Sequence, residues 1–231
     1  MANIMRLGGG AGGVAPKFIY SGAYNYYDDN GGDNWRIKLM TSGAFILNKD
    51  LLVDIFLVGG GAGGLYSTLP NETPGGGSGY TTTARSVQLF ANVSYKIGIG
   101  AGGEVGSDGG KSVALGFEAA GGKAGSGVSS NASGGDGGSG GGGYPGGEGG
   151  VDGANGGGKH GGTGQGTTTR EFGEPTGELY SFGGGTSKSE TAGAWLGASY
   201  GDGGGGGDGS FAAGRGNSGI VIIRKHKEAA A

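Results

Sequence analysis

Hydrophobic and polar residues alternate along several short stretches of the chain, which is the pattern of half-buried β-strands. Residues 52–58 (LVDIFLV) are almost continuously apolar, as expected for a central strand. No stretch shows an extended helical period. Short strands separated by turn residues predict an all-β fold with an antiparallel β-sandwich scaffold. We expect strands at residues 35–39, 44–47, 52–58, 85–90, 92–100, 112–117 and 218–225.

A glycine-rich region with a three-residue period lies before the last predicted strand. From Gly134 the triplets read GGD, GGS, GGG, GYP, GGE and GGV, with glycine always first and mostly second. Three residues per turn is the repeat of the polyproline II helix, so two of its three faces would be bare backbone. We expect such helices to pack into a bundle and pair their N–H and C=O groups. The alternative is a flexible linker, but the regular triplets and the strand that follows favour order.

The composition of the chain argues against several classes of binding partner and location. Of the 231 residues 67 are glycine, charged residues make up only 15%, and the formal net charge is −3. This balance has no basic signature of nucleic-acid binding. The chain has no cysteine and therefore no disulfide, and its start, MANIMRLGGG, lacks the features of a signal peptide. No stretch approaches the roughly 20 apolar residues of a membrane helix, so we expect no membrane insertion.

These patterns predict three regions. Residues 1–117 form a β-scaffold with an N-terminal aromatic segment, and residues 118–217 form the glycine-rich polyproline II region. Residues 218–231 contain a closing strand that returns to the scaffold, followed by a tail.

Several segments together resemble a known family. They are NWRIKLMTSG, LLVDIFLVGGGAGG, SYKIGIGAGG, TGQGTTTREFGEP and GIVIIR, which span most of the chain. The chain is similar to glycine-rich domain proteins of phages and prophages of Gram-positive bacteria, of the tail fibre or tail-tip adhesin type. The glycine tract also resembles, in texture only, the distal adhesins of T-even-like phages. In those, layers of polyproline II helices carry loops that touch the receptor.

Some residues match the spacing of enzyme motifs but lack the structural context that those motifs need. Gly59, Gly61 and Gly64 match G-x-G-x-x-G, but the residues that follow (LYSTLPNETPGGGSG) cannot form the helix that a dinucleotide site needs. Ser139 matches G-x-S-x-G inside a glycine run, without a nucleophile elbow. The only histidines are His160 and His226. We therefore expect no enzyme activity, no catalytic or cofactor-binding residues and no cofactor.

Two polar segments are better explained as structure. Asp28, Asp29, Asn30 and Asp33 form an oxygen-rich loop, but their spacing does not match an EF-hand, and a polar turn is favoured over a metal site. Residues 167–175 (TTTREFGEP) contain Arg170, Glu171 and Glu174 and predict a structural junction with a local ion pair.

Aromatic residues in the glycine-rich excursions are the candidates for recognition. Rigid aromatics on small-residue loops make many binding surfaces, and they can stack on sugars. We expect receptor contacts from Tyr144, Trp195 and Tyr200. The tyrosines near the N-terminus are expected to pack on the sandwich.

The sequence thus predicts a phage tail fibre or receptor-binding (adhesin) domain, present in the virion and made in the host cytoplasm. Its partners would be a bacterial surface glycan or protein and other tail proteins, with a homo-oligomer also open. The alternative is a structural filament or virion-decorating subunit that assembles through its glycine bundle. An ice-binding protein fits less well, because the third triplet positions mix Asp, Pro, Glu and Val.

Overall fold

The fold is all-β, with two antiparallel sheets of five strands each. The computed structural model describes residues 17–28, 34–69, 71–144, 147, 155–158, 160–162, 169–187 and 199–227. The first sheet has the order β1-β4-β7-β8-β9 and the second has the order β2-β3-β10-β5-β6. The strands are β1 (Phe18–Tyr20), β2 (Tyr24–Asp28), β3 (Trp35–Leu39), β4 (Gly43–Leu47), β5 (Leu51–Val58), β6 (Thr81–Leu89), β7 (Ser94–Gly98), β8 (Ser112–Ala114), β9 (Phe117–Ala119) and β10 (Ile220–Lys225).

Two short 3₁₀ turns are the only helical elements in the described residues. They are η1 (Ser129–Asn131) and η2 (Glu171–Gly173). No helix of this part of the chain is both long and apolar enough to span a membrane.

The strands follow the alternation of the sequence with three differences. β6 begins at Thr81, four residues before the strand predicted at residues 85–90. The strand predicted at residues 112–117 is wrong in its extent, because Leu115 and Gly116 adopt φ of 56° and 87° and turn the chain between β8 and β9. Strands β1 and β2 were not predicted. Their residues Tyr20, Tyr24 and Tyr26 pack on the core, as expected for the N-terminal aromatics.

The strand at the end of the chain closes the second sheet. β10 pairs with both β3 and β5. Alternate residues of β10 contribute to two separate cores. Val221 and Ile223 face the core between the sheets, whereas Ile220 and Ile222 join a second cluster with Phe56, Val58, Phe172 and Tyr180.

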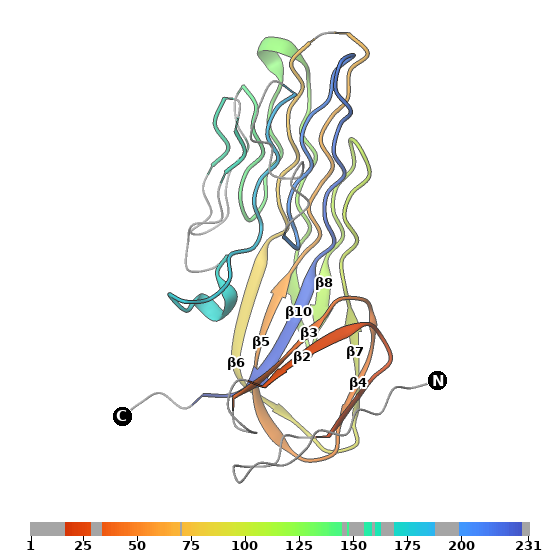
Figure 1. Ribbon diagram of the computed structural model, residues 1–231, viewed down its shortest axis with the longest axis vertical. Coiled ribbons are helices and arrows are strands. Elements are labelled where there is room, and N and C mark those ends of the chain that lie inside the picture. Colours follow the sequence, from red (N-terminus) through yellow and green to blue (C-terminus); the bar gives the residue numbers. More distant parts are fainter. Residues whose placement is uncertain are drawn as a thin grey trace.

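Beyond the sheets the chain forms what we call the glycine bundle. It contains the extended segments 59–65, 73–80, 100–111, 120–144, 181–187 and 201–219, which run side by side away from the sandwich (Figure 1). The bundle therefore uses chain from both sides of residue 118. The described chain enters at Lys17 and leaves at Lys227, both next to strands of the sandwich.

Hydrogen bonds within the bundle repeat every three residues. The N–H groups of Gly59, Ala62 and Leu65 donate to segment 73–80, and those of Gly60 and Gly63 donate to segment 100–111. Gly61 and Gly64 complete the cycle by donating to Asn217 and Gly214. Segment 75–80 repeats the pattern, with each set of N–H groups pointing to a different neighbour. The period is that of a polyproline II helix; that conformation itself stays a prediction.

Close packing explains why these positions are glycine. A Cβ atom on Gly59, Gly60 or Gly61 would lie 2.0, 2.0 or 1.9 Å from the carbonyl oxygen of a neighbouring segment. Ordinary van der Waals contacts of a Cβ atom are 3.4–4 Å. Any side chain at these positions would push neighbouring segments apart and break their hydrogen bonds. The described part of the glycine region is therefore a hydrogen-bonded body rather than a free linker.

Candidate functional site

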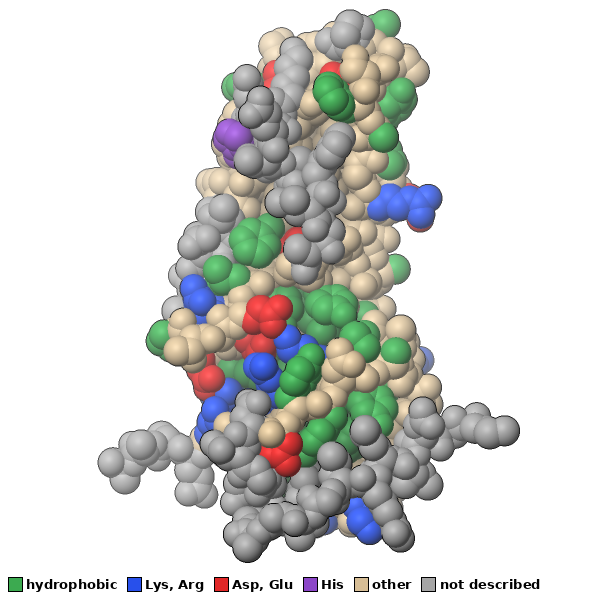
Figure 2. Space-filling view, viewed as in Figure 1, with side chains coloured by type: hydrophobic (Ala, Val, Ile, Leu, Met, Phe, Trp, Pro, Cys, Tyr) green, Lys and Arg blue, Asp and Glu red, His purple; other side chains and the backbone are tan. Residues whose placement is uncertain are grey.

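A hollow of about 510 Å³ lies near the end of the bundle that is far from the sheets. We call it the tip hollow. Its walls carry three exposed hydrophobic side chains: Tyr66, Val105 and Phe211, with 46%, 41% and 51% of their surface accessible. Figure 2 shows hydrophobic and acidic side chains at this end of the molecule. The hollow is lined by Tyr66, Val105, Asp208, Gly209, Ser210, Phe211, Ala212 and Ala213.

The walls of the tip hollow are held together through one glycine. The N–H of Gly207 donates to the C=O of Leu65, and the C=O of Gly207 accepts from the N–H of Ser67 and from Thr73 Oγ1. Tyr66 and the turn that carries Phe211 are therefore tied to one frame. In that turn, Oδ1 of Asp208 accepts hydrogen bonds from the N–H groups of Ser210 (2.8 Å) and Phe211 (3.1 Å).

Two of the three aromatics expected to contact a receptor, Tyr144 and Tyr200, do not line this hollow. Tyr144 is 44% accessible, and its N–H donates to Ala132, next to η1. Tyr200 is half-buried against the second core cluster, close to the sheets. Trp195 lies outside the described residues. Tyr144 and Tyr200 are thus at different levels of the bundle.

An anchor segment, residues 169–180, covers the outer face of the second sheet. Its acidic side chains meet basic side chains of the strands: Glu171 Oε1 lies 2.9 Å from Arg36 Nη1, and Glu178 Oε2 lies 2.5 Å from Lys38 Nζ. The hydroxyl of Tyr180 accepts from Lys38, and burial next to the acidic residues raises its pKa. The segment thus joins the strands through ion pairs with distant residues. The local ion pair expected within TTTREFGEP is not among the described contacts, in which Arg170 Nη1 donates to the C=O of Gly177.

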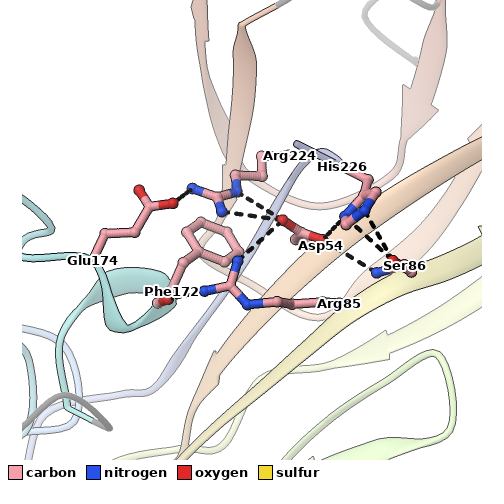
Figure 3. Close-up of polar contacts among 7 residues, drawn as sticks. All are labelled: Asp54, Arg85, Ser86, Phe172, Glu174, Arg224 and His226. Carbon is pink, nitrogen blue, oxygen red and sulfur yellow. Dashed lines mark hydrogen bonds and ion pairs between the residues drawn. The ribbon is translucent and has the colours of Figure 1, made fainter. Parts of the chain in front are cut away.

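A buried carboxylate organises the far side of the same junction (Figure 3). Asp54 of β5 is fully buried, and its Oδ2 lies 3.1 Å from Arg224 Nη2. Arg224 also binds Glu174 at 2.7 Å and lies 3.9 Å from the ring centroid of Phe172. Burial by itself would raise the pKa of Asp54, but hydrogen bonds from His226, Ser86 and Arg224 hold it below its usual value.

Ser86, His226 and Asp54 contact one another in the order of a catalytic triad. Nδ1 of His226 lies 2.5 Å from Asp54 Oδ1, and Ser86 Oγ lies 2.9 Å from Nε2. The same hydroxyl is also 3.5 Å from Nδ1. It therefore lies beside the ring and not beyond Nε2, where a base would take the proton of a nucleophile. A bulge in β6 opposite Asp54 places Ser86 here, and the contacts tie β5, β6 and β10 together.

A second buried carboxylate lies inside the bundle. Asp202 is 2% accessible, and its oxygens accept from the N–H groups of Phe182 (2.9 Å) and Ser199 (3.2 Å). Burial raises its pKa to about 7, against these two hydrogen bonds. The group can change charge near neutral pH, where an ordinary aspartate is always ionised.

Comparison with known families assigns the chain to one of them. A family model described as a glycine-rich domain matches residues 40–226. The chain belongs to the glycine-rich domain family. No curated protein matches the chain.

The match defines the extent of the glycine-rich domain within the fold. It begins just after β3 and includes strands β4 to β10, the glycine bundle and the anchor segment. Tyr144, Trp195 and Tyr200 all lie within it, as do the residues of the tip hollow. The described part of this glycine-rich domain contains no group of three or more acidic or histidine side chains placed to hold a metal ion. Of the acidic loop at residues 28–33, only Asp28 is among the described residues.

Sequence reasoning did not select Tyr66, Phe211 or Asp208. Tyr66 and Phe211 lie in glycine-rich excursions, which is the same signal that pointed to Tyr144. The signal for the turn was DGS at residues 208–210, a typical Asx-turn sequence. Nothing in the sequence shows that this turn lies beside Tyr66, because their contact runs through the backbone of Gly207.

Proposed function

We propose that the glycine-rich domain is a receptor-binding module of a phage tail, of the fibre or adhesin type. It would contact the bacterial surface through the far end of the glycine bundle. The observation that carries this proposal is the tip hollow, where Tyr66 and Phe211 are exposed on a tightly hydrogen-bonded frame. Exposed aromatics on a rigid frame lose little entropy on binding.

The arrangement of the chain is consistent with the far end of the bundle pointing towards the bacterial surface. The bundle extends away from the sandwich (Figure 1), and in this proposal other tail proteins attach at the sandwich. The bundle would then project away from the particle as an arm. In this proposal the domain is a virion component whose ligand is a glycan or protein of the bacterial surface. Tyr144 and Trp195 remain candidates for further contacts, and Tyr200 would act through its packing.

A cell-binding assay tests the proposal. Fluorescently labelled domain would be titrated onto a panel of Gram-positive cells, and bound label measured by flow cytometry. We expect saturable binding to at least one host, and a loss of at least about tenfold in affinity for the variant Tyr66→Ala/Phe211→Ala, because aromatic anchors dominate such surfaces. Phe90→Ala is the matched control, because Phe90 is 56% accessible but lies in the turn between β6 and β7.

The alternative function gives a different result in the same preparation. A filament or decorating subunit would form fibres at rising protein concentration without cells, which analytical ultracentrifugation detects. Fibre formation together with no saturable binding to any cell would contradict the receptor-binding proposal.

A further inference from the structure

We propose that the tip hollow binds a positively charged alkylammonium substituent of a cell-surface polymer. This inference rests on the proposed function and names the chemical class that its far end would recognise. Three features of the hollow carry it: its charge, its aromatic walls and its size.

The charge of the hollow comes from one carboxylate. Among the described residues that line it, Asp208 is the charged one, and only 7% of its surface is accessible. Its Oδ1 accepts hydrogen bonds from the N–H groups of Ser210 and Phe211, and no described residue donates to Oδ2. The nearby Glu104 and Arg215 neutralise each other in an ion pair of 2.9 Å. A poorly hydrated carboxylate without a cation favours a positively charged ligand and repels an anion.

The aromatic walls favour the same ligand. The ring faces of tyrosine and phenylalanine attract cations, and quaternary ammonium groups are typical ligands of such sites. Tyr66 and Phe211 stand on two different loops, joined through Gly207, and Asp208 lines the same hollow. A neutral group could stack on the rings, but it would leave the carboxylate unpaired.

The size of the hollow indicates a substituent of a polymer and not a protein surface. A volume of about 510 Å³ is in the range of small-ligand sites. A stable protein interface uses about 20–30 residues on each partner, whereas eight described residues line the hollow. We therefore commit to a small ammonium group presented on a polymer chain, with a lysine side chain as the competing source.

Binding of choline by the intact protein tests the inference. Titration calorimetry would compare choline with 3,3-dimethylbutan-1-ol, a neutral molecule of the same shape. We expect choline to bind at least about tenfold more tightly, because only the cation gains from the rings and the carboxylate. Asp208→Asn should remove this preference without unfolding the turn, because the asparagine oxygen still accepts from Ser210 and Phe211. Phe90→Ala should bind choline like the parent protein.

The remaining outcomes separate this inference from the proposed function. Equal affinity for the neutral molecule would overturn the ammonium class, and tighter binding of Nα-acetyl-lysine amide than of choline would overturn the polymer source. Saturable cell binding that choline neither competes with nor affects would leave the receptor-binding proposal standing and refute the inference. Failure of both choline and cell binding would refute both.

Discussion

Asp54 of β5 and Arg224 of β10 form a buried ion pair, with 3.1 Å between Oδ2 and Nη2. The pair lies where the anchor segment meets the second sheet. Arg224 also forms an ion pair with Glu174 of the anchor segment. A few charged side chains thus hold the anchor segment on the strands from which the glycine bundle extends.

Replacing Asp54 tests this connection. Asp54→Asn keeps an oxygen that can accept from the N–H of Ser86 but removes the charge that pairs with Arg224. We expect the free energy of unfolding at pH 7 to fall by about 3 kcal/mol, because a buried cation loses one partner. Urea denaturation measures the change. Glu118→Gln breaks the exposed pair with Lys111 and should cost at most about 1 kcal/mol. Equal effects of the two variants would contradict the role of Asp54.

The lowered pKa of Asp54 also predicts how the stability of the fold changes at acidic pH. A carboxylate with a depressed folded pKa stabilises the fold above its unfolded pKa and loses this contribution as the pH falls through the folded value. The difference in stability between the parent protein and Asp54→Asn should therefore shrink below about pH 4. A difference that stays constant down to pH 2 would show that the charge is not responsible.

For Asp202 we expect stability to depend on pH in the opposite direction, near neutral pH. Its folded pKa of about 7 lies above the unfolded value of 3.8, so the folded state holds the proton more tightly. The resulting stabilisation is complete below the unfolded pKa and is lost as the pH rises through 7. Between pH 5 and 7 the parent protein should lose up to about 1.4 kcal/mol per pH unit relative to Asp202→Asn. Parallel stability curves from urea denaturation at each pH would contradict this assignment.

Single glycines of the bundle should resist substitution according to their surroundings. In Gly61→Ala the new Cβ would lie 1.9 Å from the carbonyl oxygen of Asp202, and we expect a loss of at least about 3 kcal/mol. Gly157→Ala is the matched control, because no atom of the described residues lies within 4 Å of its Cβ position. Thermal unfolding would compare the two variants, and a tolerated Gly61→Ala would show that the segments are not so closely packed.

The anchor segment depends on one aromatic ring. Phe172 is 1% accessible, lies 6.0 Å from Phe56 between ring centroids and stacks under Arg224. Phe172→Ala should cost about 3 to 5 kcal/mol and should loosen residues 171–180 first. Limited proteolysis followed by mass spectrometry would locate the cleavage. Phe117→Ala, at a ring that is 38% accessible, should leave the cleavage pattern unchanged.

The strands of the sandwich could be predicted from the sequence because the pattern that specifies each strand lies within the strand itself. Alternation at residues 35–39 and the apolar run at 52–58 determine which side chains are buried, and both stretches are strands with those bounds or within one residue of them. The hairpin between β8 and β9 could not be predicted, because it needs a positive φ at Leu115, where a leucine is unusual. Strands β1 and β2 were missed because their aromatic residues suggested packing more than pairing.

The neighbours within the bundle could not be predicted for a different reason. Gly59 approaches Ala120, Gly60 approaches Ala101 and Gly61 approaches Asp202, three partners far apart in the chain. Glycine has no side chain that could specify these contacts, so the three-residue period indicates a bundle without indicating its order. The tip hollow depends on this order, which is why Tyr66 and Phe211 could not be paired from sequence.

Hydrogen exchange in the native protein tests the central claim, a rigid glycine bundle, most directly. Exchange of the backbone N–H groups would be measured by NMR at residues 59–65 and 75–80, with β10 as the internal reference. The account predicts protection in both segments that approaches that of β10, because each N–H donates to a neighbouring segment. Exchange at the rate of a free peptide in these segments, with β10 still protected, would contradict it.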